Sequence, residues 1–159
     1  MAATPQPYRT SLIKDPRSRT AFLLTDCPRP DGSIPTSYIP ILQEHNITNV
    51  LRLCEATQYD ATELSNAGIT VTDWHFEDGT PPPDTIIHAF RQFLLTLPPQ
   101  STVAVHCVSG IGRAPVLAAV ALIDSGIDPM EAVEIIRKHR RGALNKKQLA
   151  WLLDEKGGL

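Results

Sequence analysis

One segment constrains the fold of this chain more than any other, because a strand, a short loop and a helix follow one another between residues 102 and 126. Residues 102–105 form a run rich in β-branched side chains, which is typical of a buried strand. After the loop, apolar residues recur at helical spacing, Pro115 suits the first helical turn and Gly126 provides a stop. Backbone N–H groups and the helix dipole favour negative charge at such a junction. The segment therefore predicts an anion-binding loop.

The loop itself carries the pattern His-Cys-x5-Arg, from His106 to Arg113. Five intervening residues let the backbone curl into a cup of inward-pointing N–H groups, and Gly110 and Gly112 permit the close approach. Arg113 closes the cup with a planar fork that fits a phosphoryl group. These donors favour the thiolate form of Cys107, which is the candidate nucleophile. The predicted phosphate-binding residues are Val108, Ser109, Gly110, Ile111, Gly112 and Arg113.

Apolar runs and helical patterns alternate along the rest of the chain. Strands are expected at residues 20–25, 49–53, 69–74 and 102–105, and helices at 36–44, 61–66, from 84, after the loop, from 129 and at 146–155. Asp84 is the expected N-cap of the third helix. This alternation predicts an α/β fold with a central, mostly parallel sheet flanked by helices. Residues 1–19 are polar and contain proline, so we expect a flexible N-terminal arm before a single catalytic domain at 20–159.

Composition excludes several classes of protein. A chain of 159 residues with 42% hydrophobic and 20% charged residues is typical of one globular domain. The net charge of −2 gives no reason to expect nucleic acid binding, and there is no apolar run long enough to cross a membrane. Three widely spaced cysteines indicate neither a disulfide scaffold nor a zinc motif. We therefore expect a cytoplasmic protein without a metal or cofactor.

A pair of carboxylates follows the third expected strand, in the segment 74–79. Phosphoryl transfer needs a proton for the leaving oxygen, and Asp78 is the candidate general acid, with Glu77 as the alternative. Sites in parallel sheets form at the carboxyl ends of the strands. Cys54, Asp78 and Cys107 each follow a different strand, so we expect them to converge on one site.

Two further features have a structural and a functional interpretation. Cys54 is either a small buried apolar residue or a resolving cysteine that forms a reversible disulfide with Cys107. The basic run is either a solvated helix end or a surface for acidic lipid headgroups or an acidic partner. Its residues are Arg137, Lys138, Arg140 and Arg141. Asn145 and Gln148 follow this run at helical spacing, and such amides can position a water molecule.

Four stretches together resemble one family, the phosphatases of regenerating liver (PRL, protein tyrosine phosphatase type IVA), within the dual-specificity phosphatases. They are residues 51–57, 73–79, 104–116 and 140–149. The loop pattern alone indicates only cysteine-dependent phosphatases in general, whereas Cys-Glu-Ala-Thr after the second strand and Arg-Ala-Pro-Val at the end of the loop narrow the resemblance. The similarity extends over nearly the whole chain from about Tyr8.

The resemblance implies a protein tyrosine phosphatase that works through a phosphocysteine intermediate, without metal or cofactor. It implies Cys107 as nucleophile, Arg113 as phosphate clamp, Asp78 as general acid and Cys54 as the redox partner of Cys107. The implied substrates are proteins phosphorylated on tyrosine, serine or threonine. Family members also form homotrimers and bind cyclin-M magnesium transporters. The resemblance therefore implies a homotrimer and such a partner for this chain.

Three departures from the wider superfamily or the family modify these expectations. Many superfamily members carry Ser or Thr after the arginine, where a hydroxyl assists the departing sulfur; Ala114 cannot, so we expect low turnover. The family's Trp-Pro-Phe is Trp-His-Phe here, which predicts a more mobile acid loop. The family usually ends in a prenylated cysteine, and this sequence ends in Lys-Gly-Gly-Leu. We therefore expect peripheral membrane attachment only if a lipidated tail lies beyond this sequence.

Two other functions compete with a catalytic role on proteins. The first is a binding module that docks a partner in the loop, with slow chemistry as a by-product, and Ala114 and Cys54 favour it. The second is a phosphoinositide phosphatase. A lipid site needs extra cations inside the loop, and Val108, Ser109 and Ile111 supply none.

Overall fold

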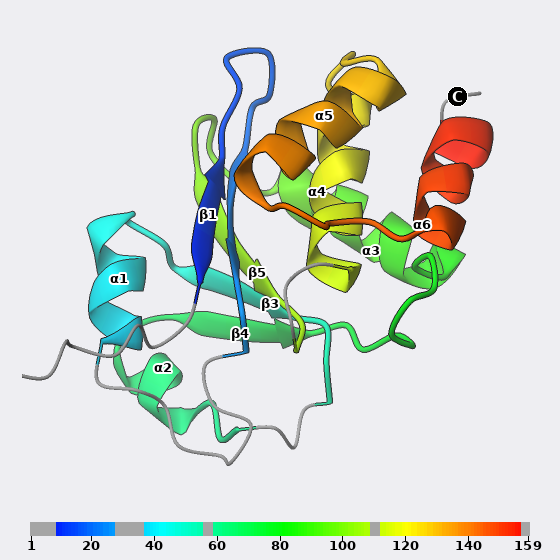
Figure 1. Cartoon of the computed structure of the whole chain (residues 1–159). Helices are drawn as coiled ribbons and strands as arrows, with labels where there is room; N and C mark the ends of the chain where they lie inside the picture. The colour runs from blue at the N-terminus through cyan, green and yellow to red at the C-terminus, as the bar shows by residue number, and fades with distance from the viewer. Residues whose placement is uncertain (1–8, 28–36, 56–58, 109–111, 157–159) are drawn as a thin grey trace, which may run out of the picture.

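A five-stranded sheet forms the centre of the molecule (Figure 1). The computed structural model describes residues 9–27, 37–55, 59–108 and 112–156. The strands are β1 (Thr10–Ile13), β2 (Ala21–Thr25), β3 (Asn49–Arg52), β4 (Thr70–Asp73) and β5 (Thr102–His106), and their order in the sheet is β1-β2-β5-β3-β4. All neighbouring pairs are parallel except β1 with β2. The predicted mostly parallel α/β sheet is therefore confirmed.

Helices cover both faces of this sheet, as Figure 1 shows. One face carries α1 (Tyr38–Glu44) and α2 (Thr62–Asn66). The other carries α3 (Asp84–Leu95), α4 (Arg113–Asp124), α5 (Pro129–His139) and α6 (Lys146–Trp151), and α6 continues into a π-helical turn at Leu152–Lys156. The three-layer arrangement explains the sequence pattern, since strands that are covered on both faces are apolar on both faces.

The sheet separates two hydrophobic clusters. The α1-side cluster consists of Leu23, Cys27, Tyr38, Leu42, Ile47, Val50, Cys54, Tyr59, Leu64, Ile69 and Ala104. The larger α4-side cluster contains Phe22, Leu24, Leu51, Val105 and Cys107, together with the inner sides of α3, α4 and α5. Successive residues of β2, β3 and β5 thus alternate between the two clusters, as strand geometry requires.

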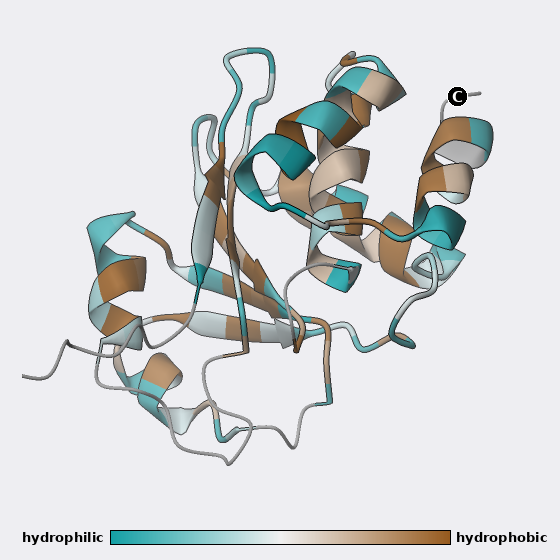
Figure 2. Ribbon diagram, in the orientation of Figure 1, coloured by the Kyte–Doolittle hydropathy of each residue, from teal (hydrophilic) through white to brown (hydrophobic). Residues whose placement is uncertain are grey.

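The central helix α4 is buried from Arg113 to Leu122. Brown and tan residues run along most of it in Figure 2, whereas α5 and α6 also present teal, hydrophilic residues. A helix without a solvated stripe has neighbours all round. Its first residue, Arg113, is therefore held in a fixed place at the edge of the sheet.

The structure corrects two local expectations. Part of the stretch 1–19, expected to be a loose arm, forms the edge strand β1, in which Ile13 is fully buried and pairs with Phe22. A four-residue strand with one buried position has too little alternation to be recognised in a sequence. Asp84 is the first residue of α3, and the N-cap is Pro83, whose extended backbone ends the triple-proline segment. Residues 10–13 thus belong to the sheet, whereas the expectation of a single catalytic domain stays a prediction.

Candidate active site

The three predicted site segments meet at the carboxyl edge of the sheet. Cys107 directly follows β5, Cys54 lies just beyond β3, and the segment 74–79 follows β4. Backbone hydrogen bonds tie these ends together, because Leu53 N–H donates to the His106 carbonyl (3.0 Å) and Trp74 N–H donates to the Arg52 carbonyl (2.9 Å). A pocket of about 340 Å³ opens there. Its lining residues are Cys54, Glu55, His75, Glu77, Asp78, Val108 and Arg113.

Arg113 is the most firmly positioned group in this pocket. Its guanidinium is buried, and Nη1 donates to the carbonyl oxygens of Leu53 (3.1 Å) and Phe76 (3.0 Å). Its Nε has no hydrogen-bond acceptor among the described residues and faces Asp78 Oδ1 at 3.6 Å. A buried donor needs an acceptor. The side chain is therefore oriented by the ends of two neighbouring strands, and it retains a donor for an anion.

Asp78 and Glu77 both reach the pocket, so the structure brings both candidate acids to the site. The Asp78 side chain is 73% exposed, and its Oδ1 lies 3.6 Å from Arg113 Nε. The loop that carries it is fastened at Gly79, whose carbonyl accepts a hydrogen bond from Asn145 Nδ2 (3.0 Å). Gly79 has a φ of 81°, which favours glycine at this turn.

Two amides of α6 complete this side of the pocket. Asn145 caps α6, and it exchanges hydrogen bonds with Gln148 in a capping box. Gln148 is fully buried, and its Nε2 has no partner among the described residues. A Cβ on Gly112 would lie 3.3 Å from Gln148 Nε2 and 3.7 Å from Asp78 Oδ1. The Gln148 amide is thus next to the end of the phosphate loop and to Asp78.

The two predicted redox cysteines lie on different sides of the sheet. Cys107 packs in the α4-side cluster and Cys54 in the α1-side cluster, and neither forms a disulfide. A hydrogen bond with Cys27 and burial raise the pKa of Cys54. Both effects favour the thiol form of Cys54, and the described residues contain no disulfide.

His106 precedes the loop and makes side-chain contacts that the sequence did not predict. It is fully buried, with Nδ1 3.1 Å from the Cys107 carbonyl oxygen and Nε2 2.7 Å from the Tyr59 hydroxyl. Cys27 also supports the loop, since its N–H donates to the Val108 carbonyl (3.1 Å). Cys27 and Tyr59 come from segments far from the loop in sequence, and no motif marks either of them.

The phosphate loop is described in part. Val108 is exposed, and Gly112 precedes the first residue of α4. The predicted phosphate-binding residues Ser109, Gly110 and Ile111 lie outside the described residues.

The basic run does not form one exposed surface. Arg140 is only 2% exposed, and its guanidinium donates to Asp26 (3.1 Å) and to the Leu24 carbonyl (2.7 Å). Including Arg140 in an acidic-lipid surface was therefore wrong, because this cation joins α5 to β2. Arg137 donates to the carbonyls of residues 143 and 144, and it is exposed, as are Lys138 and Arg141.

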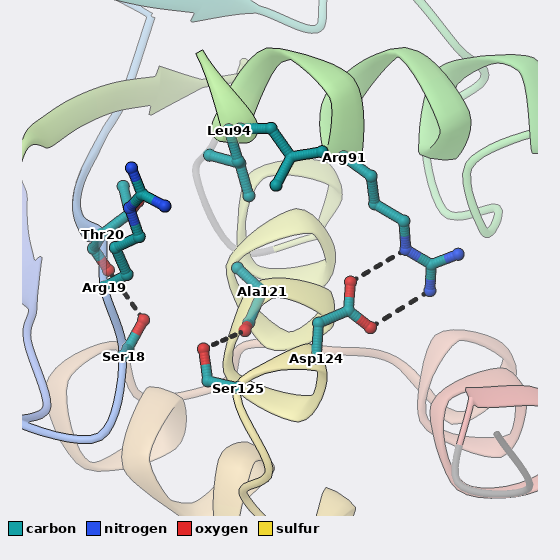
Figure 3. A pocket seen from close by; sticks show the side chains of 9 residues that line it. Ser18, Arg19, Thr20, Arg91, Leu94, Ala121, Asp124 and Ser125 are labelled. Carbon is teal, nitrogen blue, oxygen red and sulfur yellow. Dashed lines mark hydrogen bonds and ion pairs between the residues drawn. The ribbon is translucent and has the colours of Figure 1, made fainter. Parts of the chain in front are cut away.

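A second pocket of about 360 Å³ lies away from the loop, beside the far end of α4 (Figure 3). It is lined by Ser18, Arg19, Thr20, Arg91, Leu94, Leu95, Ala121, Asp124 and Ser125. Arg91 forms a two-point ion pair with Asp124 across it, at 2.8 and 3.1 Å (Figure 3). The lining contains no cysteine or histidine, so it offers no thiol nucleophile. Among the described helices, none is long and apolar enough to cross a membrane.

Known proteins are similar to this chain in sequence and in fold. A family model described as a polymorphic toxin system DSP-PTPase phosphatase matches residues 27–127. Protein tyrosine phosphatase type IVA 3 of Mus musculus is 46% identical over 134 residues, which cover 82% of this chain and 76% of that protein. PRL-1 phosphatase of Drosophila melanogaster is 47% identical over 134 residues, which cover 82% and 74%. A solved protein tyrosine phosphatase structure from Leishmania major has a TM-score of 0.76 and 33% identity, covering 91% of this chain and 97% of that one.

The fold and the cysteine–arginine loop define a dual-specificity-type, cysteine-dependent protein tyrosine phosphatase. Within this class the relatives agree on one group. The chain belongs to the type IVA, or PRL, family of protein tyrosine phosphatases. This confirms the family and the fold class predicted from the four sequence stretches.

Proposed function

We propose that this chain hydrolyses phosphate monoesters on protein side chains, phosphotyrosine above all and phosphoserine and phosphothreonine as well, through a phosphocysteine on Cys107. One observation carries the proposal: the buried Arg113 guanidinium is fixed by the carbonyls of Leu53 and Phe76, and its Nε, 3.6 Å from Asp78 Oδ1, has no hydrogen-bond acceptor among the described residues. A rigidly held guanidinium that keeps a donor at the pocket suits a phosphoryl dianion.

The first step transfers the phosphoryl group to the enzyme. The Cys107 thiolate attacks phosphorus, the P–O bond to the side-chain oxygen breaks, and Asp78 gives that oxygen a proton. Arg113 and the N–H groups of residues 108–112 hold the three non-bridging oxygens. The proximity of Asp78 Oδ1 to Arg113 Nε supports this assignment, since both groups must contact one phosphoryl group.

The second step releases phosphate. Water attacks phosphorus, Asp78 takes its proton, and the S–P bond breaks to return the Cys107 thiolate. Gln148 is the group that positions this water, a role supported by its buried, unpartnered Nε2 beside Gly112 and Asp78. Ala114 is buried and carries no hydroxyl to assist the departing sulfur, so this step is slow.

Rapid-mixing kinetics test the proposal. A chromogenic aryl phosphate is mixed with a near-stoichiometric amount of enzyme under strong reductant. We expect a burst of about one equivalent of aryl alcohol per enzyme, followed by a slow steady phase, because phosphocysteine breakdown limits turnover. Cys54→Ser is the matched control and keeps the burst. An enzyme with neither burst nor turnover contradicts the proposal and supports the binding-module alternative.

The redox role of Cys54 is a further part of the proposal. Hydrogen peroxide oxidises the Cys107 thiolate to a sulfenic acid; the Cys54 sulfur then displaces water and forms the S–S bond. The pairing of Arg52 with His106 supports it, because Cys54 and Cys107 follow these two neighbouring strand ends. Adjacent strands lie about 4.8 Å apart, and a disulfide needs Cα atoms about 4.4–6.8 Å apart. Both side chains have to leave their separate clusters for the bond to form.

Peptide mapping after peroxide treatment tests this disulfide. We expect the Cys54 and Cys107 peptides to be linked, with activity restored by a thiol reductant, and the same link in a Cys27→Ser variant. In Cys54→Ser, Cys107 proceeds to irreversible sulfinic acid. Linkage of Cys54 to Cys27 instead, or equal overoxidation of Cys107 with and without Cys54, contradicts the proposed pair.

Other roles stay predictions from the family resemblance alone. These are the cyclin-M-type magnesium transporter partner, the homotrimer and the phosphoinositide activity. The predicted surface for acidic lipid headgroups now consists of Arg137, Lys138 and Arg141, because Arg140 is buried.

A further inference from the structure

Two cysteines and a histidine that could ligate a metal lie close together near the phosphate loop, on the α1 side of the sheet. Cys27, Cys54 and His106 are all buried, with exposed fractions of 6%, 1% and 0%. Their ligand atoms lie within 4.8 Å of one another, and Cys54 Sγ is 3.9 Å from His106 Nδ1. In a tetrahedral zinc site, where zinc–sulfur and zinc–nitrogen bonds are about 2.3 and 2.0 Å, ligand atoms are about 3.5–3.8 Å apart. Zinc binding therefore requires these ligand atoms to approach one another by at most about 1.3 Å.

The surroundings of His106 match those of a metal ligand. Metal-binding imidazoles usually direct their second ring nitrogen to a hydrogen-bonding partner, which fixes the tautomer. Tyr59 supplies that partner, with its hydroxyl 2.7 Å from Nε2. Nδ1, the nitrogen near Cys54, is then the coordinating atom, in exchange for its contact with the Cys107 carbonyl.

Charge and chemistry select the metal. Thiolates and imidazole together prefer Zn²⁺ among the common hard and borderline cations. Two thiolates neutralise one Zn²⁺, so the complex places no net charge in the apolar α1-side cluster. The two displaced thiol protons pass to bulk water.

We propose that Cys27, Cys54 and His106 form a buried Zn²⁺ site, with both thiolates and His106 Nδ1 as ligands and a water molecule in the fourth position. The pairs of parallel strands at this edge bring two of the ligands together, and Cys27 reaches them from the end of β2. The Cys-to-Cys spacing of 27 residues explains why no metal motif was visible in the sequence.

The site is connected to the phosphate loop. A carbonyl oxygen can only accept, so without metal Nδ1–H donates to the Cys107 carbonyl, and Nε2 of the neutral imidazole then accepts from the Tyr59 hydroxyl. With zinc on Nδ1, the ring proton is on Nε2, and this Nε2–H donates to the Tyr59 oxygen. The carbonyl of Cys107 then loses its hydrogen bond from the imidazole. Cys27, whose N–H holds the Val108 carbonyl, is fixed by the same ion. Zinc binding therefore acts on the two residues that hydrogen-bond to the carbonyls of Cys107 and Val108.

Cobalt absorption tests the site without measuring activity. Co²⁺ is titrated into the reduced Cys107→Ser protein, so that the catalytic sulfur is absent. We expect one equivalent of Co²⁺ to give sulfur-to-cobalt charge-transfer absorption, which added Zn²⁺ removes. Replacing Cys27 by serine in this background lowers the charge-transfer intensity per bound cobalt by about half and weakens binding by more than about 100-fold, because a ligand is lost.

Tyr59→Phe is the matched control. It keeps both thiolates, so the intensity per bound cobalt is unchanged, while binding weakens about 10–100-fold through loss of the hydrogen bond to His106. Absence of charge-transfer absorption in the Cys107→Ser protein overturns the site whether or not the Cys27 variant folds. Absorption that persists undiminished without Cys27 overturns the ligand set. Neither outcome depends on the proposed function, since this background has no nucleophile.

Discussion

Cys107→Ser eliminates both the burst and the steady-state turnover, lowering kcat/KM by at least about 10⁴-fold, as expected when a covalent nucleophile is lost. A serine hydroxyl is not ionised at neutral pH and is a far weaker nucleophile than a thiolate. Cys107 is 1% exposed, and serine is no larger, so the substitution fits the same space. The measurement is the rapid-mixing time course described above, with wild type and variant at equal concentrations.

Binding separates this loss of chemistry from a loss of structure. Arg113 and its two carbonyl partners do not involve the Cys107 sulfur. Inorganic phosphate should therefore raise the Tm of Cys107→Ser about as much as that of the wild type, because a ligand of the native state stabilises it by mass action. Residual burst kinetics in the variant, or a variant that binds phosphate yet turns over like wild type, contradicts Cys107 as nucleophile.

The local features of the site could be predicted from the sequence. The His106–Arg113 spacing, the preceding strand and Pro115 lie within a few residues of one another, so backbone geometry alone relates them. The convergence of Cys54 and Asp78 on the loop needed one further rule, that parallel strands end at the same edge. The alternation of strands and helices was sufficient to apply that rule, and the sheet order confirms it.

Features that depend on long-range packing could not be predicted. Arg140 sits in a run of cations, and only the approach of β2 and Asp26, 114 residues away, makes it a buried structural group. Cys27 and Tyr59 meet His106 across 79 and 47 residues of sequence, with no periodic pattern to relate them. Side chains of the same type therefore differ in role according to what the folded chain places beside them.

Asp78→Asn should lower turnover about 10²–10⁴-fold on a phosphotyrosine peptide, and far less on an aryl phosphate with a strongly acidic phenol. Asparagine keeps the shape of the side chain but has no acidic proton to give, and only a poor leaving group needs that proton. The substitution also removes a negative charge 3.6 Å from Arg113 Nε. Phosphate dianions should then bind at least as tightly, so KM does not rise. The measurement is kcat and KM over a series of leaving groups.

Glu77→Gln is the matched control, because Glu77 lines the same pocket and is the alternative acid. We expect its dependence on the leaving group to equal that of the wild type. If Glu77→Gln instead loses activity selectively on poor leaving groups while Asp78→Asn does not, the acid is Glu77, and the contact between Asp78 and Arg113 serves to orient the guanidinium. Equal, leaving-group-independent losses in both variants would indicate that neither carboxylate protonates the leaving oxygen and that the loop acts by excluding water. The 3.6 Å contact favours Asp78, since the group that protonates the leaving oxygen must approach the same phosphoryl group that Arg113 holds.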